Sequence, residues 1–177
     1  MANTWTLLCQ DSELDTGNVL AGILNAGARI LRIRRVGMLN VQTAGATTSV
    51  AELHLYWLSA TATWAGESAV SAISHDTTNG ALASVDTGYA GTPATTGTSY
   101  DIRRTCWSSD EAAVSGDGTD EWEMFVPLNI MWDQAYGDSD LEALTLRQDQ
   151  MIYLKSVYCG ETNGEIDVWI EFTDEAA

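Results

Sequence analysis

Near the C-terminal end of the chain every second residue is apolar, and this period of two predicts a β-strand. In the stretch 164–172, Gly-Glu-Ile-Asp-Val-Trp-Ile-Glu-Phe, every second position is apolar: Ile166, Val168, Ile170 and Phe172. Successive side chains of a strand point to opposite faces, so the pattern predicts an antiparallel strand with one buried face and one solvent face. A helix would not gather these four residues in one stripe, because its side chains repeat at a different period.

A second run rich in β-forming residues, 151–159, precedes this strand, and Asn163-Gly164 stands between the two. Asn-Gly favours positive φ at both central positions of a tight turn. The sequence therefore predicts a β-hairpin over 151–172, which we place at the centre of a β-sandwich.

Further short strands are expected along the chain, separated by polar turns. The segments that favour strand are 29–42, 50–58, 68–74, 99–108 and 122–126. In the first of them, Arg35 and Gly37 interrupt the apolar face, which predicts a β-bulge near these residues. Residues 138–147 fit either one or two capped helical turns or a strand that opens at Leu144.

The sum is roughly eight short strands with long loops and almost no helix. This pattern favours an all-β fold, an antiparallel β-sandwich or jelly roll, over an α/β fold. We expect residues 1–28 to form an N-terminal arm or irregular lead-in, with a short strand over 4–9. Residues 29–177 are expected to form a single β-sandwich domain, because 177 residues suit one domain of ordinary size.

The charge balance excludes some classes of partner. The chain has 25 Asp and Glu against 8 Lys and Arg, a formal net charge of −17. Such a surface repels phosphates, so we expect no nucleic-acid binding. Apolar runs are all shorter than the roughly 20 residues that cross a bilayer, so we also expect no membrane association.

The cysteines and the first residues indicate where the protein is made. Cys9, Cys106 and Cys159 are widely spaced and odd in number, which argues against a disulfide framework or a zinc site. We interpret them as small buried residues of a reducing compartment. The start Met-Ala-Asn-Thr-Trp lacks the basic residues and apolar core of a secretion signal, so we expect synthesis in the cytoplasm.

No reaction is indicated by the sequence, and we expect no catalytic residues and no enzyme. His54 is expected on the outward face of a strand with Glu52 and Tyr56. His75 is next to Asp76, but neighbouring strand residues point to opposite faces, which argues against an acid–base pair. A nucleophile motif such as Gly-x-Ser-x-Gly does not occur.

Two kinds of residue suggest binding sites. Asp117 and Asp120 lie in an acidic, Gly-rich turn that offers oxygen ligands to Ca²⁺, although a solvated turn without a cofactor is the favoured interpretation. Trp64, Trp107 and Trp169 suit sugar stacking, but large aromatic residues more often fill a core or a subunit contact.

Four of the seven arginines, Arg29, Arg32, Arg34 and Arg35, lie close together in a very acidic chain. They would either neutralise carboxylates of the same chain or of a second subunit, or dock on an acidic partner. We favour the first alternative. With Trp5, these arginines are the candidate partner-binding residues.

Three segments resemble small structural proteins of tailed bacteriophages. They are Arg-Ile-Arg-Arg-Val-Gly-Met-Leu-Asn-Val-Gln (32–42), Ala-Glu-Leu-His-Leu-Tyr-Trp-Leu-Ser-Ala (51–60) and the closing Gly-Glu-Ile-Asp-Val-Trp-Ile-Glu-Phe-Thr-Asp-Glu (164–175). The chain is similar in this pattern to head decoration proteins, also called cement proteins.

The resemblance implies a jelly-roll protein that sits as a homotrimer on the outer capsid surface of the virion. Its partner would be the major capsid protein, whose neighbouring subunits it would bridge through the arm 1–28 and the strand Arg29–Arg35. One alternative is a phage fibre, tail or lectin-like jelly roll that binds carbohydrate. Another is an accessory domain of a glycoside hydrolase, which the missing catalytic motifs make the weakest of the three.

Overall fold

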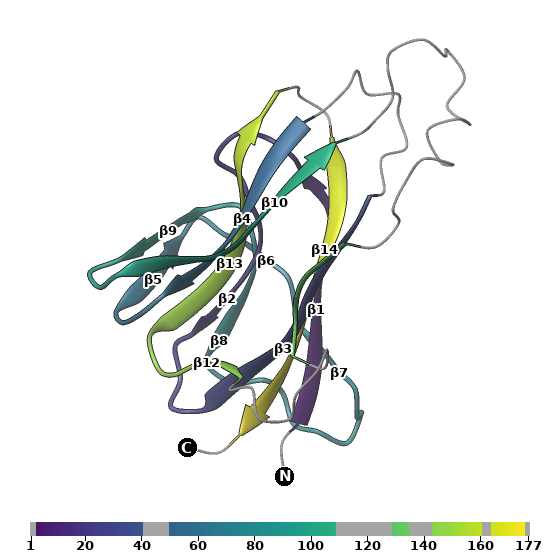
Figure 1. Ribbon diagram of the computed structural model, residues 1–177. Helices are drawn as coiled ribbons and strands as arrows, with labels where there is room; N and C mark the ends of the chain where they lie inside the picture. The colour runs from purple at the N-terminus through teal and green to yellow at the C-terminus, as the bar shows by residue number, and fades with distance from the viewer. Residues whose placement is uncertain (1–2, 41–49, 109–128, 135–142, 161–163, 176–177) are drawn as a thin grey trace.

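The computed structural model describes residues 3–40, 50–108, 129–134, 143–160 and 164–175 (Figure 1). These residues form fourteen strands and no α-helix, and every strand pair is antiparallel. The prediction of an all-β, antiparallel sandwich is therefore confirmed.

Two six-stranded sheets make the two layers. In the first sheet the order is β11 (Asn129–Asp133), β3 (Ile30–Asn40), β14 (Glu165–Glu175), β1 (Asn3–Glu13) and β7 (Ile73–Ser74), with β12 (Leu144–Leu146) also paired to β3. In the second sheet the order is β10 (Ser99–Ser108), β4 (Val50–Leu58), β13 (Gln150–Cys159), β2 (Val19–Asn25), β8 (Val85–Tyr89) and β6 (Ser68–Ala69). Strands β5 (Ala62–Ala65) and β9 (Thr92–Thr95) form a separate pair.

The core lies between the two sheets and follows from the alternation in the sequence. Ile166, Val168, Ile170 and Phe172 of β14 are all fully buried, as their period predicts. They belong to one large cluster with buried residues of the opposite sheet, including Leu53, Leu55, Ile152 and Leu154.

The predicted hairpin over 151–172 is wrong, because its two strands lie in different sheets. Strand β13 pairs with β2 and β4, whereas β14 pairs with β1 and β3. Both strands are central in their sheets, as expected. Each has an apolar face that must be buried, and here the two faces belong to opposite sheets of one core instead of to neighbours in one sheet.

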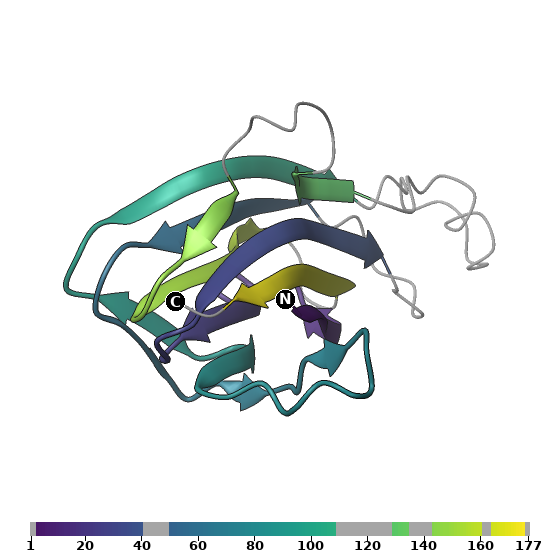
Figure 2. The same ribbon diagram turned by 90° about the horizontal axis from the view of Figure 1, so that it is seen from below.

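The predicted N-terminal arm is also wrong. Strand β1 pairs with β14 from Asn3, opposite Asp174, to Glu13, opposite Glu165 (Figures 1 and 2). Strand β2 is buried at every residue and pairs with β13. Because β2 is covered on both faces, it lacks the alternation that marks a half-exposed strand. The strands on either side of residue 28 therefore belong to the same two sheets.

A bulge in β3 sets the direction of its arginines. Ile33 lies opposite Phe172 and Arg35 lies opposite Glu171, so Arg34 is the extra residue. This is one position before the predicted bulge. The extra residue switches the inward parity, because Ile33 and then Val36 are both fully buried.

Within the segment 59–98, the β5–β9 pair packs on the outer face of the second sheet, whereas β6 and β8 are strands of that sheet and β7 is a strand of the first. Trp64 of β5 packs in a second hydrophobic cluster with Val19, Leu24, Leu58, Ala62, Met151 and Tyr153. Gly22 lies beneath it, since a Cβ there would come within 3.1 Å of the Trp64 ring. The prediction of short strands near 68–74 is confirmed by β6 and β7. Of the two alternatives for 138–147, β12 shows a strand at Leu144, while residues 138–142 lie outside the described residues.

Candidate functional site

A buried histidine on β4 lies between two carboxylates. The Nε2 atom of His54 is 2.6 Å from Glu52 Oε1, and its Nδ1 atom is 2.8 Å from Asp101 Oδ2 on the neighbouring strand β10. His54 is only 5% exposed, although the sequence indicates the outward face. The arrangement ties the edge strand β10 to β4 by charged hydrogen bonds.

Two further side chains complete this charged network. Arg104 Nε donates to Asp101 Oδ2 over 2.6 Å. The Tyr56 hydroxyl lies 3.2 Å from His54 Nδ1. Burial, followed by the negative charge of Asp101, raises the pKa of Tyr56, while the positive charge of Arg104 opposes this rise.

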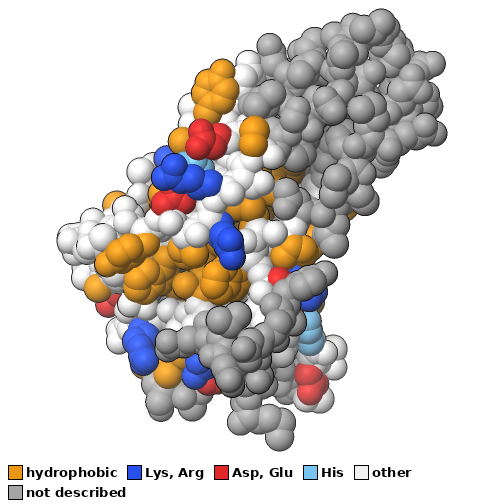
Figure 3. Space-filling model, viewed as in Figure 1, with side chains coloured by type: hydrophobic (Ala, Val, Ile, Leu, Met, Phe, Trp, Pro, Cys, Tyr) orange, Lys and Arg blue, Asp and Glu red, His pale blue; other side chains and the backbone are white. Residues whose placement is uncertain are grey.

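A shallow cavity of about 390 Å³ lies beside the network, lined by Glu52, Arg104, Thr105, Cys106 and Tyr158. The Arg104 side chain is 65% exposed, and Tyr158 is 56% exposed. Figure 3 shows acidic, basic and histidine side chains gathered at one place on the visible face, next to hydrophobic ones. An exposed aromatic ring beside an anchored arginine suits contact with another molecule.

The surroundings of His54 do not suit a general acid or base. Both ring nitrogens of His54 already face carboxylate oxygens, so neither is presented to a substrate. At the second histidine, His75 Nε2 lies 2.7 Å from Thr6 Oγ1. Asp76 instead accepts from the hydroxyl and backbone N–H of Thr78, and these hydrogen bonds lower the pKa of Asp76.

The four arginines are paired within the chain, which is the alternative that the sequence analysis favours. Their partners lie on β14, on β11 and next to β11. Arg29 pairs with Asp174 (2.8 Å), Arg32 with Glu175 (3.0 Å), Arg34 with Gln134 (2.9 Å), and Arg35 with Asp133 (3.0 Å) and Glu171 (3.7 Å). These contacts account for the basic cluster without a second molecule.

The tryptophans proposed for binding are mostly used in packing. Trp5 is 4% exposed. Trp64 is 9% exposed, and its indole N–H donates to Ala90 O over 2.9 Å. The Trp169 ring lies against Gly37 of the neighbouring strand. The side chain of Trp107 and the calcium candidates Asp117 and Asp120 lie outside the described residues.

A stacked aromatic pair lies on the edge of the second sheet. Trp57 and Tyr100 face each other across β4 and β10, with ring centroids 5.2 Å apart, and Tyr100 is 49% exposed. Sequence analysis missed this pair, the contact of His54 with Asp101, and the hydrogen bond of Arg104 to Asp101. Glu52 and His54 are two positions apart, which indicates that they share a polar face of the strand. The sequence does not show which strand pairs with this one and places its side chains beside them.

Within the described ranges, no group of three His, Cys, Asp or Glu side chains is arranged to hold a metal ion. The same residues include no helix of the length and hydrophobicity needed to cross a membrane. Comparison with protein families, curated proteins and solved structures finds no match for this chain.

Proposed function

We propose that this chain is a structural protein of a tailed-phage virion that binds the outer surface of the assembled capsid. There it stabilises the shell by bridging neighbouring major capsid subunits, and it acts as a homotrimer. Binding that favours the assembled shell over loose subunits stabilises the shell by mass action.

The strand order is the observation that carries this proposal. The order β1-β14-β3-β11 in the first sheet faces β2-β13-β4-β10 in the second. We interpret it as two interlocked Greek keys, the connectivity of a jelly roll, because successive strands alternate between the sheets at both ends of the chain. Jelly rolls are typical of viral capsid and lectin domains. The net charge of −17 agrees with a surface that avoids the packaged genome.

The surface proposed for the capsid contact is the charged network of Glu52, His54, Asp101 and Arg104 with the exposed Tyr158. It replaces the arm and the arginine strand, since residues 3–13 and 19–25 are strands of the two sheets and the arginines are paired internally. Aromatic residues and arginine are the side chains that contribute most to protein interfaces.

The test is to add the purified protein to undecorated capsids of the same phage and to measure co-sedimentation and the temperature of capsid rupture. We expect binding and a higher rupture temperature. Tyr158→Ala and Arg104→Ala should weaken binding, whereas Ile73→Ala, which truncates an exposed residue on β7, should not. Absence of co-sedimentation by the native protein would reject the proposal.

A second candidate function is carbohydrate binding, which the partly exposed Trp57–Tyr100 stack favours. Sugar rings pack on aromatic faces of this kind. A glycan array with native protein and with Tyr100→Ala separates the two functions. Selective glycan binding that Tyr100→Ala abolishes would support the lectin function, and its absence together with capsid binding would support the capsid function.

A further inference from the structure

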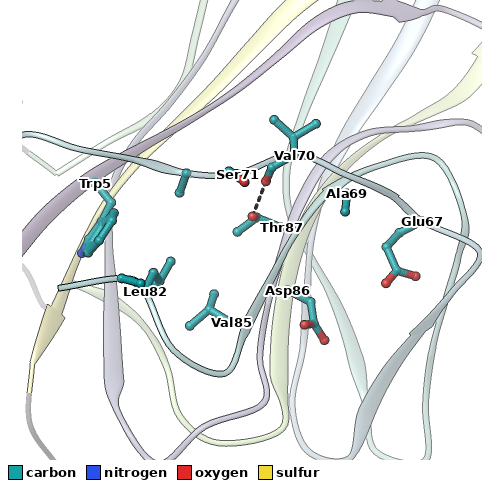
Figure 4. Close-up of a pocket in the computed structure, with 11 residues that line it drawn as sticks. Trp5, Glu67, Ala69, Val70, Ser71, Leu82, Val85, Asp86 and Thr87 are labelled. Carbon is teal, nitrogen blue, oxygen red and sulfur yellow. Dashed lines mark hydrogen bonds between the residues drawn. The ribbon is translucent and has the colours of Figure 1, made fainter.

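A second cavity lies at the edge of the sandwich formed by β1 and β7 in one sheet and β8 and β6 in the other. Its volume is about 360 Å³. The lining residues are Trp5, Glu67, Ala69, Val70, Ser71, Ala72, Ala81, Leu82, Val85, Asp86 and Thr87 (Figure 4). Two segments form its long walls, one leading from β6 toward β7 and the other leading into β8.

The walls are held in place by hydrogen bonds within the chain. The indole N–H of Trp5 donates to Asp174 Oδ1 over 3.1 Å, which fixes the ring at one end. Val70 N donates to Thr87 O over 2.9 Å, and the Thr87 hydroxyl donates back to Val70 O (Figure 4). These contacts within the chain hold the cavity walls in place, and a preorganised site of this kind costs less to order on binding.

The two ends of the cavity differ in chemistry. Trp5 and the apolar Leu82 and Val85 lie toward one end, and Glu67 and Asp86 lie at the other (Figure 4). Lys, Arg and His do not occur among the lining residues. With two carboxylates and no cation, the lining attracts positive charge, and the net charge of −17 adds to this attraction.

We propose that this cavity binds a small organic cation, an ammonium group joined to an apolar or aromatic body. The body lies against Trp5, Leu82 and Val85, and the ammonium group lies at Glu67 and Asp86. The volume falls within the range of roughly 300–1,000 Å³ that is usual for small-molecule sites. The proposal does not depend on the capsid function, because it uses neither Tyr158 nor the His54 network.

The test is isothermal titration of the full chain with three probes of similar size: 2-phenylethylammonium, 2-phenylethanol and 3-phenylpropionate. We expect the ammonium to bind most tightly, the neutral alcohol more weakly and the carboxylate not measurably. Equal affinity for the ammonium and the alcohol, or no binding of the ammonium, would overturn the proposal.

Charge variants locate the ammonium group. Glu67→Gln and Asp86→Asn should each weaken ammonium binding by about two- to fivefold and leave alcohol binding unchanged. Glu165→Gln is the matched control, because Glu165 begins β14 opposite Glu13, whereas Trp5 lies opposite Phe172 near the other end of the strand. An equal effect of all three substitutions would show general electrostatics and contradict a defined site.

A filling variant locates the apolar body. Ala81 lines the cavity and is exposed, so Ala81→Phe should block binding without loss of the fold. Ala83 is exposed in the same segment but does not line the cavity, and Ala83→Phe should bind as the native chain does. Unfolding midpoints of both variants show that they are folded. Unchanged ammonium binding by folded Ala81→Phe would overturn the proposal.

Discussion

Trp5 and Asp174, 169 positions apart in the sequence, are hydrogen-bonded between the first and last strands, with Trp5 Nε1 3.1 Å from Asp174 Oδ1. The second carboxylate oxygen of Asp174 lies 2.8 Å from Arg29 Nε. Asp174 is 2% exposed, so its charge is buried and depends on these two partners. One side chain thus joins β1, β14 and the start of β3.

Asp174→Ala should lower the free energy of unfolding by about 2–3 kcal/mol. The substitution leaves a buried indole N–H without its acceptor and removes the ion-pair partner of Arg29. Urea unfolding followed by circular dichroism measures the loss. Glu175→Ala is the matched control: its pair with Arg32 is partly exposed, so the loss should stay below about 1 kcal/mol. Equal losses in the two variants would show that the buried contact contributes no more to stability than the partly exposed one.

The layers of the fold could be predicted from local patterns, but the strand partners could not. Alternation identifies β14 and its inward residues, because one buried face leaves a period of two in the sequence. The alternation contains no information on whether β13 lies beside β14 or across the core from it. The turn-forming pair Asn163-Gly164 favoured the prediction that the two strands are neighbours. Strand β2 has no alternation because both of its faces are covered.

The candidate site was predictable only in part. The arginine cluster of β3 and its pairing within the chain follow from scarce positive charge in an acidic protein. The burial of His54 does not follow, since it depends on Asp101 and Arg104 from a strand about fifty residues away. Similarly, Trp5 and Asp86 line one cavity because β1 and β8 lie at the same edge of the sandwich.

Position 37 should not tolerate a side chain, because the Trp169 ring occupies the space next to Gly37. A Cβ at position 37 would collide with the Trp169 ring. Gly37→Ala should therefore cost about 1–3 kcal/mol of stability. In a Trp169→Ala background the same change should instead be neutral or stabilise by up to about 1 kcal/mol, because alanine restricts the unfolded chain. Gly80→Ala, with no atom near its Cβ, is the control in urea unfolding. A cost that persists without the ring would contradict this account.

Cys9 should make the protein less stable at alkaline pH. Burial raises the pKa of the Cys9 thiol from 9.0 to about 12. Between these values the unfolded chain loses the proton and the folded chain keeps it, so the free energy of unfolding falls as pH rises. At about pH 10.5 this loss amounts to about 2 kcal/mol.

Comparison with Cys9→Ala isolates this contribution. The variant should be less stable than the native chain at about pH 8, because a buried side chain is shortened. Its further loss of stability between about pH 8 and about pH 10.5 should be about 2 kcal/mol smaller than that of the native chain. Urea unfolding at the two pH values measures both quantities, and identical pH dependence in the two proteins would refute the prediction.

The contact between His54 and Asp101 should be strongly coupled, because His54 is buried and its Nδ1 lies 2.8 Å from a carboxylate oxygen. A double-mutant cycle with His54→Ala and Asp101→Ala should give a coupling energy of about 1–3 kcal/mol in urea unfolding. Thr6 and His75 provide the control cycle, since their hydrogen bond of 2.7 Å is exposed. Its coupling should stay below about 0.5 kcal/mol, because solvent replaces an exposed contact at little cost. If both cycles gave the same small value, the network would not hold β10 to β4, and the surface proposed for the capsid contact would lose its rigid support.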